Sequence, residues 1–311
     1  MRNSKMIRYF TVLLVSVLGS LNLQAMAQAD KPITDKWALI VGVGEFPSID
    51  VKTQYVKTSV GPGLLVASHT NSLTYTVKDA CDLRDFLIDK AGFKPDHVRL
   101  LINRFATHDN IAYNMGAGWL QKVARPDDLV LLYFSSHGSD PIALDASGVP
   151  VALNRAGSQE VNNYIVTYDF DWHNPGGTGI SMQKLGEMVK RSIKSNRVVV
   201  IADTCFSGNL TTRGMGRNAD PMGFGQIAVT ACAAEETSLD DPIRQNGLFT
   251  SYLLDRLDKH KGLLKPSLDD MQESVITAAR VRMHEQHPIV NYSRWTGGDV
   301  SLFATPTNPV Q

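Results

Sequence analysis

DDLVLLYFSSHG, from Asp127 to Gly138, and RVVVIADTCFSG, from Arg197 to Gly208, are the two stretches that decide the fold. Each is an apolar, largely branched run of the length of a strand that is buried on both faces, a pattern typical of parallel sheets covered by helices. One run leads to His137 and the other to Cys205. Because ligands bind beyond the carboxyl ends of such strands, the pair indicates a cysteine nucleophile with a histidine base, and a cysteine peptidase is our hypothesis.

Strand and helix patterns alternate along the rest of the chain and predict one doubly wound α/β domain. Two glycines, Gly116 and Gly118, weaken the second helix in this prediction. The segment 139–179, inserted between the two site-bearing strands, is of a kind that commonly shapes an active site. We expect further strands at 36–44, 97–103, 225–232 and 300–303, a strand or hairpin at 164–170, a glycine-rich turn at 175–179, and helices at 75–92, 107–123, 181–193, 248–257 and 268–283.

The N-terminus has the pattern of an export signal. Arg2, Lys5 and Arg8 precede an apolar stretch from Tyr9 to Leu23, and Ala25-Met26-Ala27 offers small residues for cleavage after Ala27. A single membrane anchor is the alternative, but the apolar core is shorter than the roughly 20 residues that span a bilayer. We therefore expect an exported protein, periplasmic or secreted, without a stable anchor: signal peptide 1–27, linker 28–35, catalytic domain 36–305 and tail 306–311.

Charge and cysteine content exclude several classes. The chain of 311 residues carries 31 basic and 31 acidic residues, and loss of the signal leaves a net charge of about −3. This balance argues against a nucleic-acid partner. The three cysteines, Cys81, Cys205 and Cys232, match no zinc spacing and cannot all pair internally. A Cys81–Cys232 bridge and two buried reduced thiols both remain open.

Five stretches of the chain carry a family likeness: YFSSHG, DTCFSG, KWALIVGVGEF, YTVKDACDLRDFL and GFKPDHVRLLINRFATHDNI. Together they resemble the metacaspases, within the wider group of caspase-like peptidases. The histidine and cysteine motifs stand in the family's order, about 68 residues apart, and the likeness covers nearly all of 36–303. Either motif alone would be weak.

The resemblance implies an α/β/α sandwich around a mainly parallel six-stranded sheet, and a Cys-His dyad that cleaves peptide bonds. An ordinary thiol, with a pKa of about 8.5, is barely ionised at neutral pH, so His137 would accept the proton of Cys205. The imidazolium would then protonate the departing amine. By the resemblance, the backbone N–H groups of Gly138 and Cys205 form the oxyanion hole.

The resemblance also implies a pocket for Arg or Lys, formed by Asp79 at the start of the first helix and Asp203 two residues before the nucleophile. Ser135 is expected to border it. Paired carboxylates bind guanidinium and repel acids, so cleavage is expected after Arg or Lys. Alternatively, Asp79 is a helix-start acid favoured by the macrodipole, and Asp203 a satisfied buried acid.

Calcium activates many metacaspases, but the available acids here, Asp140, Asp145, Asp169 and Asp171, lack the spacing of an EF-hand. The resemblance therefore leaves calcium open as an activator, with no cofactor required for the chemistry. Basic residues at Arg213 and Arg217 suggest self-processing. The expected partners are protein or peptide substrates with basic residues.

Two other readings of the family remain open. One is a caspase-like binding or scaffold domain that does not cleave. The other is an asparagine-specific peptidase or a transpeptidase, which the two acids disfavour. A zinc site of His137, Cys205 and Asp203 lacks an evident fourth ligand.

Overall fold

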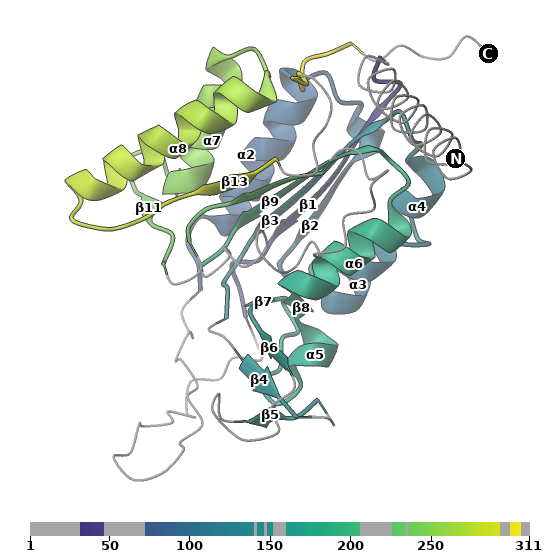
Figure 1. The fold of residues 1–311 in the computed structure, drawn as a ribbon, viewed down its shortest axis with the longest axis vertical. Helices are drawn as coiled ribbons and strands as arrows, with labels where there is room; N and C mark the ends of the chain where they lie inside the picture. The colour runs from purple at the N-terminus through teal and green to yellow at the C-terminus, as the bar shows by residue number, and fades with distance from the viewer. Residues whose placement is uncertain are drawn as a thin grey trace, which may run out of the picture.

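A computed structural model describes residues 32–46, 72–139, 142–145, 148–151, 160–205, 226–233, 236–292 and 299–305. At its centre is a six-stranded sheet with the order β13-β10-β9-β3-β1-β2 (Figure 1). All neighbouring strands run parallel except β13, which pairs antiparallel with β10. The strands are β1 (Lys36–Gly42), β2 (Val98–Ile102), β3 (Leu129–Ser135), β9 (Arg197–Asp203), β10 (Gln226–Thr230) and β13 (Ile289–Asn291).

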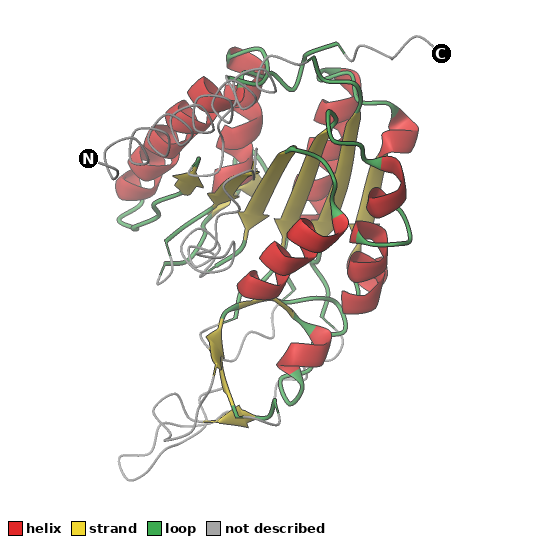
Figure 2. Cartoon of the chain, turned by 45° about the vertical axis from the view of Figure 1, so that its right-hand side comes forward, coloured by secondary structure: helices red, strands yellow, loops and turns green. Residues whose placement is uncertain are grey.

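Helices cover both faces of this sheet and confirm the predicted α/β/α sandwich (Figures 1 and 2). Along β3, Leu131 and Tyr133 face one core while Leu132 and Phe134 face the other, as the alternation of side chains in a strand requires. The first core includes α2 (Thr76–Asp89), α7 (Leu248–Lys259) and α8 (Leu264–Val281), and the second includes α3 (His108–Met115), α4 (Leu120–Val123) and α6 (Met182–Ser192).

Short elements fill the connections. The short strands and the short helix between β3 and α6 lie below the sheet in Figure 1, whereas α6 packs against it. Two single 3₁₀ turns, Pro95–His97 and Asn103–Phe105, flank β2. The remaining pieces are β4 (Ile142–Leu144), β5 (Pro150–Val151), β6 (Glu160–Asn162), β7 (Tyr164–Ile165), α5 (Pro175–Thr178), β8 (Ile180–Ser181), β11 (Asp240–Asp241) and β12 (Asn246–Gly247).

The single helix predicted over 107–123 is wrong in extent, because the chain breaks into α3 and α4. Gly116 leaves the helical region, with φ −93° and ψ −138°, and ends α3. The predicted start is confirmed: the Thr107 hydroxyl accepts a hydrogen bond from the Asn110 N–H at 3.2 Å. Ser181 caps α6 in the same way, through the N–H of Lys184.

The strand predicted at 300–303 is also wrong. Ser301 forms only an isolated bridge with Leu263, and the sixth strand is instead β13, whose three residues are too few to show a period. Within 164–170 only Tyr164–Ile165 is strand. The turn predicted at 175–179 contains the short helix α5.

A buried lysine fixes the C-terminal segment to the start of the sheet. Lys36 is 1% exposed, and its Nζ donates to the carbonyl oxygens of Ala91, Leu302 and Ala304 at 2.5, 3.0 and 2.9 Å. Burial lowers the pKa of Lys36 to about 8. The ammonium also lies 5.0 Å from the centre of the Phe93 ring. These contacts satisfy the buried ammonium and hold 302–304 against the end of α2.

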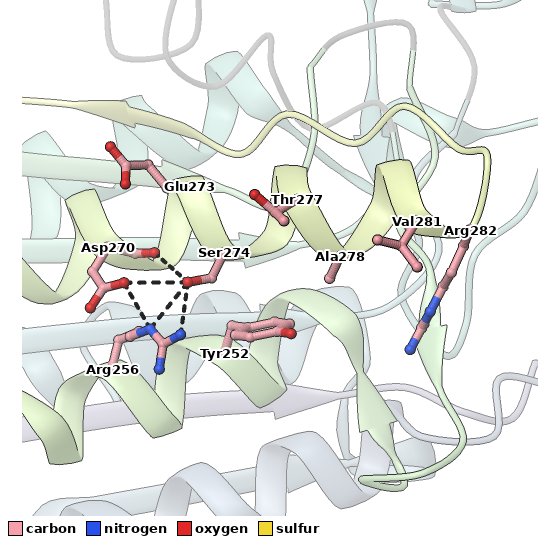
Figure 3. A pocket seen from close by; sticks show the side chains of 9 residues that line it. All are labelled: Tyr252, Arg256, Asp270, Glu273, Ser274, Thr277, Ala278, Val281 and Arg282. Carbon is pink, nitrogen blue, oxygen red and sulfur yellow. Dashed lines mark hydrogen bonds and ion pairs between the residues drawn. The ribbon is translucent and has the colours of Figure 1, made fainter.

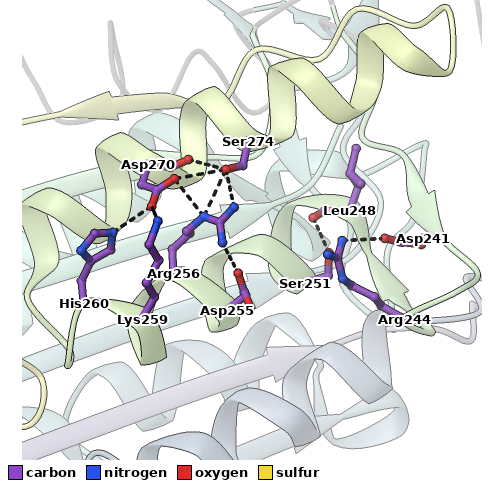
Figure 4. Close-up of polar contacts among 10 residues, drawn as sticks. All are labelled: Asp241, Arg244, Leu248, Ser251, Asp255, Arg256, Lys259, His260, Asp270 and Ser274. Carbon is purple, nitrogen blue, oxygen red and sulfur yellow. Dashed lines mark hydrogen bonds and ion pairs between the residues drawn. The ribbon is translucent and has the colours of Figure 1, made fainter.

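Helices α7 and α8 are joined by a polar network (Figure 4). The guanidinium of Arg256 reaches the Asp270 carboxylate at 2.9 Å and the Ser274 hydroxyl at 2.9 Å. Lys259 and His260 contact the same carboxylate at 2.7 and 2.8 Å. The network fixes the helix pair that packs behind β9 and β10.

No helix in the described part of the chain is long and apolar enough to cross a membrane.

Candidate active site

The two predicted motifs lie at the same edge of the sheet. Strands β3 and β9 pair in parallel with Ser135 opposite Asp203. The pairing continues one step further, because the Ser136 N–H donates to the Asp203 carbonyl at 3.3 Å. His137 and Cys205 therefore extend side by side beyond the carboxyl ends of neighbouring strands.

The segment that carries His137 contacts residues 165–166 on one side and Cys205 on the other. The carbonyl of His137 accepts the N–H of Val166 at 3.0 Å, and Gly138 forms a bridge with Ile165. The half-buried imidazole lies 4.9 Å from the Phe46 ring, centre to centre. A Cβ on Gly138 would overlap the carbonyl oxygen of Cys205, so only glycine allows this approach of the two segments.

The Cys205 thiol is partly exposed, as a nucleophile must be. Burial raises its pKa, and the negative charge of Asp203 acts in the same direction. The backbone of Ser238 opposes that rise in pKa. All three cysteines are free, so the Cys81–Cys232 bridge does not form.

The carboxylates of Asp79 and Asp203 lie close together, and Asp203 precedes Cys205 by two residues. Asp79 comes from the first turn of α2 and Asp203 from the end of β9, and they are 1% and 6% exposed. A Cβ on Gly247 would lie 3.1 Å from Asp79 Oδ2 and 3.0 Å from Asp203 Oδ2, so both carboxylates border one small space. Asp79 accepts hydrogen bonds from the Asn246 side chain and the Gly247 N–H at 2.9 and 3.0 Å, across to another element. It is thus more than a helix-start acid.

Among the described residues, the hydrogen-bond donors to these two carboxylates are uncharged. Thr250 and Ser238 donate hydroxyl hydrogen bonds to Asp203 at 2.6 and 3.0 Å. Burial raises the pKa of Asp79, and the charge of Asp203 raises it further; burial likewise raises the pKa of Asp203. Raised pKa values of this kind are typical of carboxylates that await a cation or share a proton.

Ser135 lies on the same face as Asp203, its register partner. Its side chain is 1% exposed, and the hydroxyl, although close to the Tyr133 phenol, forms no hydrogen bond of acceptable geometry with any described residue. A donor and acceptor is thus available beside the acid pair.

Asp240 is a neighbouring acid that the sequence analysis missed. It lies opposite Gly247 in the β11–β12 pair, which places its Cβ on the face where the two carboxylates meet. Its successor Asp241 is buried on the other face and binds Arg244 and Arg282 at 3.1 and 3.2 Å. Asp240 raises the pKa of both pair members. The sequence around Asp240-Asp241 gave no indication that Asp240 faces the candidate site.

Three of the four acids considered for calcium lie in the described residues, and their carboxylates accept hydrogen bonds from the protein. Asp169 accepts the N–H of His108 and the Thr167 hydroxyl at 2.9 and 2.8 Å, Asp171 accepts the N–H of His173 at 2.9 Å, and Asp145 accepts the N–H of Val149 at 3.0 Å. Asp140 lies outside the described residues, as do Arg213 and Arg217. Among the residues described, no group of three or more His, Cys, Asp or Glu side chains is arranged to hold a metal ion.

A hollow of about 540 Å³ lies on the outer side of α7 and α8 (Figure 3). It contains none of the residues that the sequence predicts to be functional. Arg256, Asp270 and Ser274, which form part of its wall, are already bonded to one another. The candidate catalytic residues therefore lie at the strand ends, away from this hollow.

These features define a class: an α/β/α protein with a thiol and an imidazole at adjacent strand ends. The sequence profile of the caspase domain matches residues 35–297, and the chain belongs to this peptidase family. Two solved structures share the fold. A Geobacter sulfurreducens protein has a TM-score of 0.55 at 17% identity, covering 88% of this chain and 98% of that one. Caspase-1 from Spodoptera frugiperda has 0.53 at 14%, covering 88% and 92%.

The curated relatives are metacaspases. Metacaspase-1 of Yarrowia lipolytica is 30% identical over 102 residues, which are 28% of this chain and 22% of that protein. Metacaspase-1 of Saccharomyces cerevisiae is 27% identical over 154 residues, 48% of this chain and 32% of the relative. The matched part is therefore less than a third of each relative's length.

Proposed function

We propose that the protein is a cysteine endopeptidase that uses Cys205 and His137 to cleave peptide bonds after Arg or Lys. The observation that carries the proposal is the buried pair Asp79 and Asp203, which borders a space next to the nucleophile. A cation in that space would relieve the repulsion between two carboxylates, whereas an acidic side chain would increase it.

The chemistry begins with transfer of the Cys205 proton to His137 and attack of the thiolate on the scissile carbonyl carbon. The oxyanion then lies between the N–H groups of Gly138 and Cys205, whose backbones are in close approach. Protonated His137 gives its proton to the leaving amine, which departs as the carbon–nitrogen bond breaks. Water, activated by the same imidazole, attacks the thioester, releases the carboxylic acid and restores the thiol.

The side chain that precedes the cleaved bond would enter past Gly247. Its guanidinium or ammonium would bind to Asp79 and Asp203, with Ser135 available as a further partner. Asp240, exposed at the edge of the same face, would add negative charge at the entrance. The natural substrates are accordingly proteins or peptides with basic residues. Nucleic acid is not an expected partner.

Three finer expectations belong to the same proposal. Export through a signal at 1–27 would place the enzyme in the periplasm or outside the cell without a stable anchor. Calcium would act as an activator away from the chemistry. The segment with Arg213 and Arg217 would be a site of self-cleavage, giving two fragments that a Cys205→Ala protein does not produce.

The test is hydrolysis of matched fluorogenic peptides that end in Arg, Lys, Asp or Asn, with and without calcium, under reducing conditions. Cleavage after Arg and Lys is expected, and Cys205→Ala and His137→Ala should abolish it. Cleavage only after Asp or Asn would overturn the acidic pocket but not the dyad. A folded protein that cleaves no peptide would indicate a non-cleaving, caspase-like binding domain.

A further inference from the structure

The Asp203 carboxylate lies at the end of a chain of buried hydroxyl groups. The Thr250 hydroxyl donates to Asp203 Oδ2 at 2.6 Å, and the Tyr133 phenol oxygen lies 2.6 Å from the same Thr250 oxygen. Thr250 and Tyr133 are both 0% exposed. Because Thr250 gives its single hydroxyl proton to the carboxylate, the phenol is the donor to Thr250. The chain therefore runs in one direction, from Tyr133 through Thr250 to Asp203.

Three elements bring these groups together. Tyr133 of β3 pairs in register with Ile201 of β9, and Asp203 follows Ile201 by two residues, so the three side chains share one face of the sheet. Thr250 comes from the first turn of α7, which covers that face. The surrounding core is apolar, and a buried hydroxyl without a partner is costly there. The loss of one member of the chain should therefore affect the next.

The start of α7 favours negative charge at the same place. Gly247 immediately precedes this helix of 12 residues, and its N–H donates to Asp79 Oδ1 at 3.0 Å. A Cβ on Gly247 would lie 3.0 Å from Asp203 Oδ2. Both carboxylates thus lie at the N-terminus of α7, where the aligned peptide dipoles stabilise an anion. Thr250 adds a direct hydrogen bond from this helix to Asp203.

We propose that Thr250 and Tyr133 are positioning residues that hold the Asp203 carboxylate in place and in its charged form, and so set the selectivity of the pocket for a cation. The proposal deepens the peptidase function given above and rests on it. A hydroxyl stabilises a carboxylate without neutralising it, so the charge stays available to the guanidinium or ammonium of a substrate. A hydroxyl that accepts a hydrogen bond donates a stronger one. Tyr133 therefore acts through Thr250, and Thr250 acts through Asp203.

The ionisation of Asp203 reports on this arrangement. Burial raises the pKa of Asp203 to about 6, and the Thr250 hydroxyl opposes that rise because it binds the charged form better. Titratable groups on several elements interact with Asp203: Asp79 on α2, Tyr133 on β3, Asp240 on β11 and the thiol of Cys205. Removal of the Thr250 hydroxyl leaves all of these groups in place and should raise the pKa of Asp203 further.

The first test needs no peptide substrate. The carboxyl carbons of aspartate are labelled with carbon-13 in the full-length protein carrying Cys205→Ala, and their NMR signals are followed against pH. Asp203→Asn identifies the signal of Asp203. In Thr250→Val, which keeps the branched shape, we expect the midpoint to rise by about 0.5–1 pH unit, and Thr250→Ser should restore it. An unmoved midpoint in folded Thr250→Val overturns the proposal.

A second variant covers the case in which Thr250→Val does not fold. Tyr133→Phe removes one oxygen and leaves the bond between Thr250 and Asp203, so the midpoint should rise by about 0.2–0.5 pH unit. The matched control is Tyr292→Phe, which removes a phenol that donates to Asp269 Oδ1 at 3.2 Å from the edge strand β13. The control should leave the Asp203 signal unmoved. Equal shifts in the two variants would overturn the role of Tyr133.

Selectivity is then measured in active protein, as the ratio of kcat/KM for an Arg peptide to that for its citrulline counterpart near pH 6. In Thr250→Val the ratio should fall about 3- to 10-fold through KM for the Arg peptide, with cleavage of the citrulline peptide unchanged. Alkylation of Cys205 by iodoacetamide should also be unchanged. Equal losses on both peptides would indicate a general disturbance and overturn the assignment. If the parent cleaves neither peptide, the proposed function fails, and the NMR titration still decides the role of Thr250 and Tyr133.

Discussion

Gly138 lies against the carbonyl of Cys205 so closely that a single added methyl group would overlap the carbonyl oxygen. The segment that carries the imidazole and the segment that carries the thiol are thus in direct backbone contact. The relative position of the two reacting groups follows from this backbone packing.

Gly138→Ala should remove activity without unfolding the protein. The methyl group must push the two segments apart, which displaces the oxyanion donors and the dyad together, and we expect a loss of at least about 10²-fold in kcat/KM. The assay is hydrolysis of an Arg peptide, with thermal unfolding to show that the domain is intact. Gly176→Ala is the matched control, because its nearest neighbour would be Leu144 Cδ1 at an ordinary 3.8 Å. Near-parental activity in Gly138→Ala would contradict the close approach.

Gly247→Ala should block the pocket. Its Cβ would lie 3.0 Å from one carboxylate oxygen and 3.1 Å from the other, in the space that a substrate cation would occupy. The φ of Gly247 is −57°, which alanine adopts without strain. We therefore expect KM for an Arg peptide to rise at least about tenfold with the fold retained. Alkylation of Cys205 serves as the control and should be unaffected.

Asp79→Asn should make the protein more stable in mild alkali. The pKa of Asp79 in the folded state is raised above its unfolded value, so the folded state binds the extra proton. Its contribution to stability is fully present below the unfolded pKa and is lost as pH rises through the folded pKa. The variant should unfold at nearly the parental temperature near pH 4. At pH 8 its unfolding free energy should exceed that of the parent by on the order of 1–2 kcal/mol. A parental advantage at pH 8 would show that the acid pair is not repulsive.

The preference for arginine should increase with pH. Because the pKa values of Asp79 and Asp203 are both raised, part of the pair is protonated in weak acid and binds a cation poorly. The ratio of kcat/KM for an Arg peptide to that for its citrulline counterpart should grow between pH 5.5 and 8. The ratio cancels the ionisation of the dyad, which affects both peptides alike. A flat ratio would indicate that the acids do not bind the substrate side chain.

Lys36→Met should weaken the attachment of the C-terminal segment. The substitution leaves the carbonyls of Ala91, Leu302 and Ala304 without the ammonium that they share. We expect a loss of about 1–3 kcal/mol in the free energy of unfolding, measured by urea denaturation. Lys90→Met, which removes an exposed pair with Asp258, should change it by less than about 1 kcal/mol. Similar losses in the two variants would contradict the role of Lys36 as an anchor.

The sequence predicted the parts of the fold that local pattern determines. The buried runs at β3 and β9, with their polar ends, placed His137 and Cys205 at one sheet edge, and hydroxyl caps marked the starts of α3 and α6. The sequence could not predict β13, whose three residues acquire strand character only by pairing with β10. It also gave no signal for Asp240 or Ser238, because their roles depend on closeness to Asp79 or Asp203, which are distant from them in the chain.

The pairing of Ser135 with Asp203 has a consequence for how this chain can change length. In a connection between the two strands that contacts neither His137 nor Cys205, the chain could gain or lose residues without moving either reacting group, because neither strand end would shift. One residue inserted within β3 or β9 would instead turn every later side chain to the opposite face and carry the imidazole or the thiol away from its partner. Insertions and deletions should therefore be tolerated in such a connection and not within the seven residues of either strand.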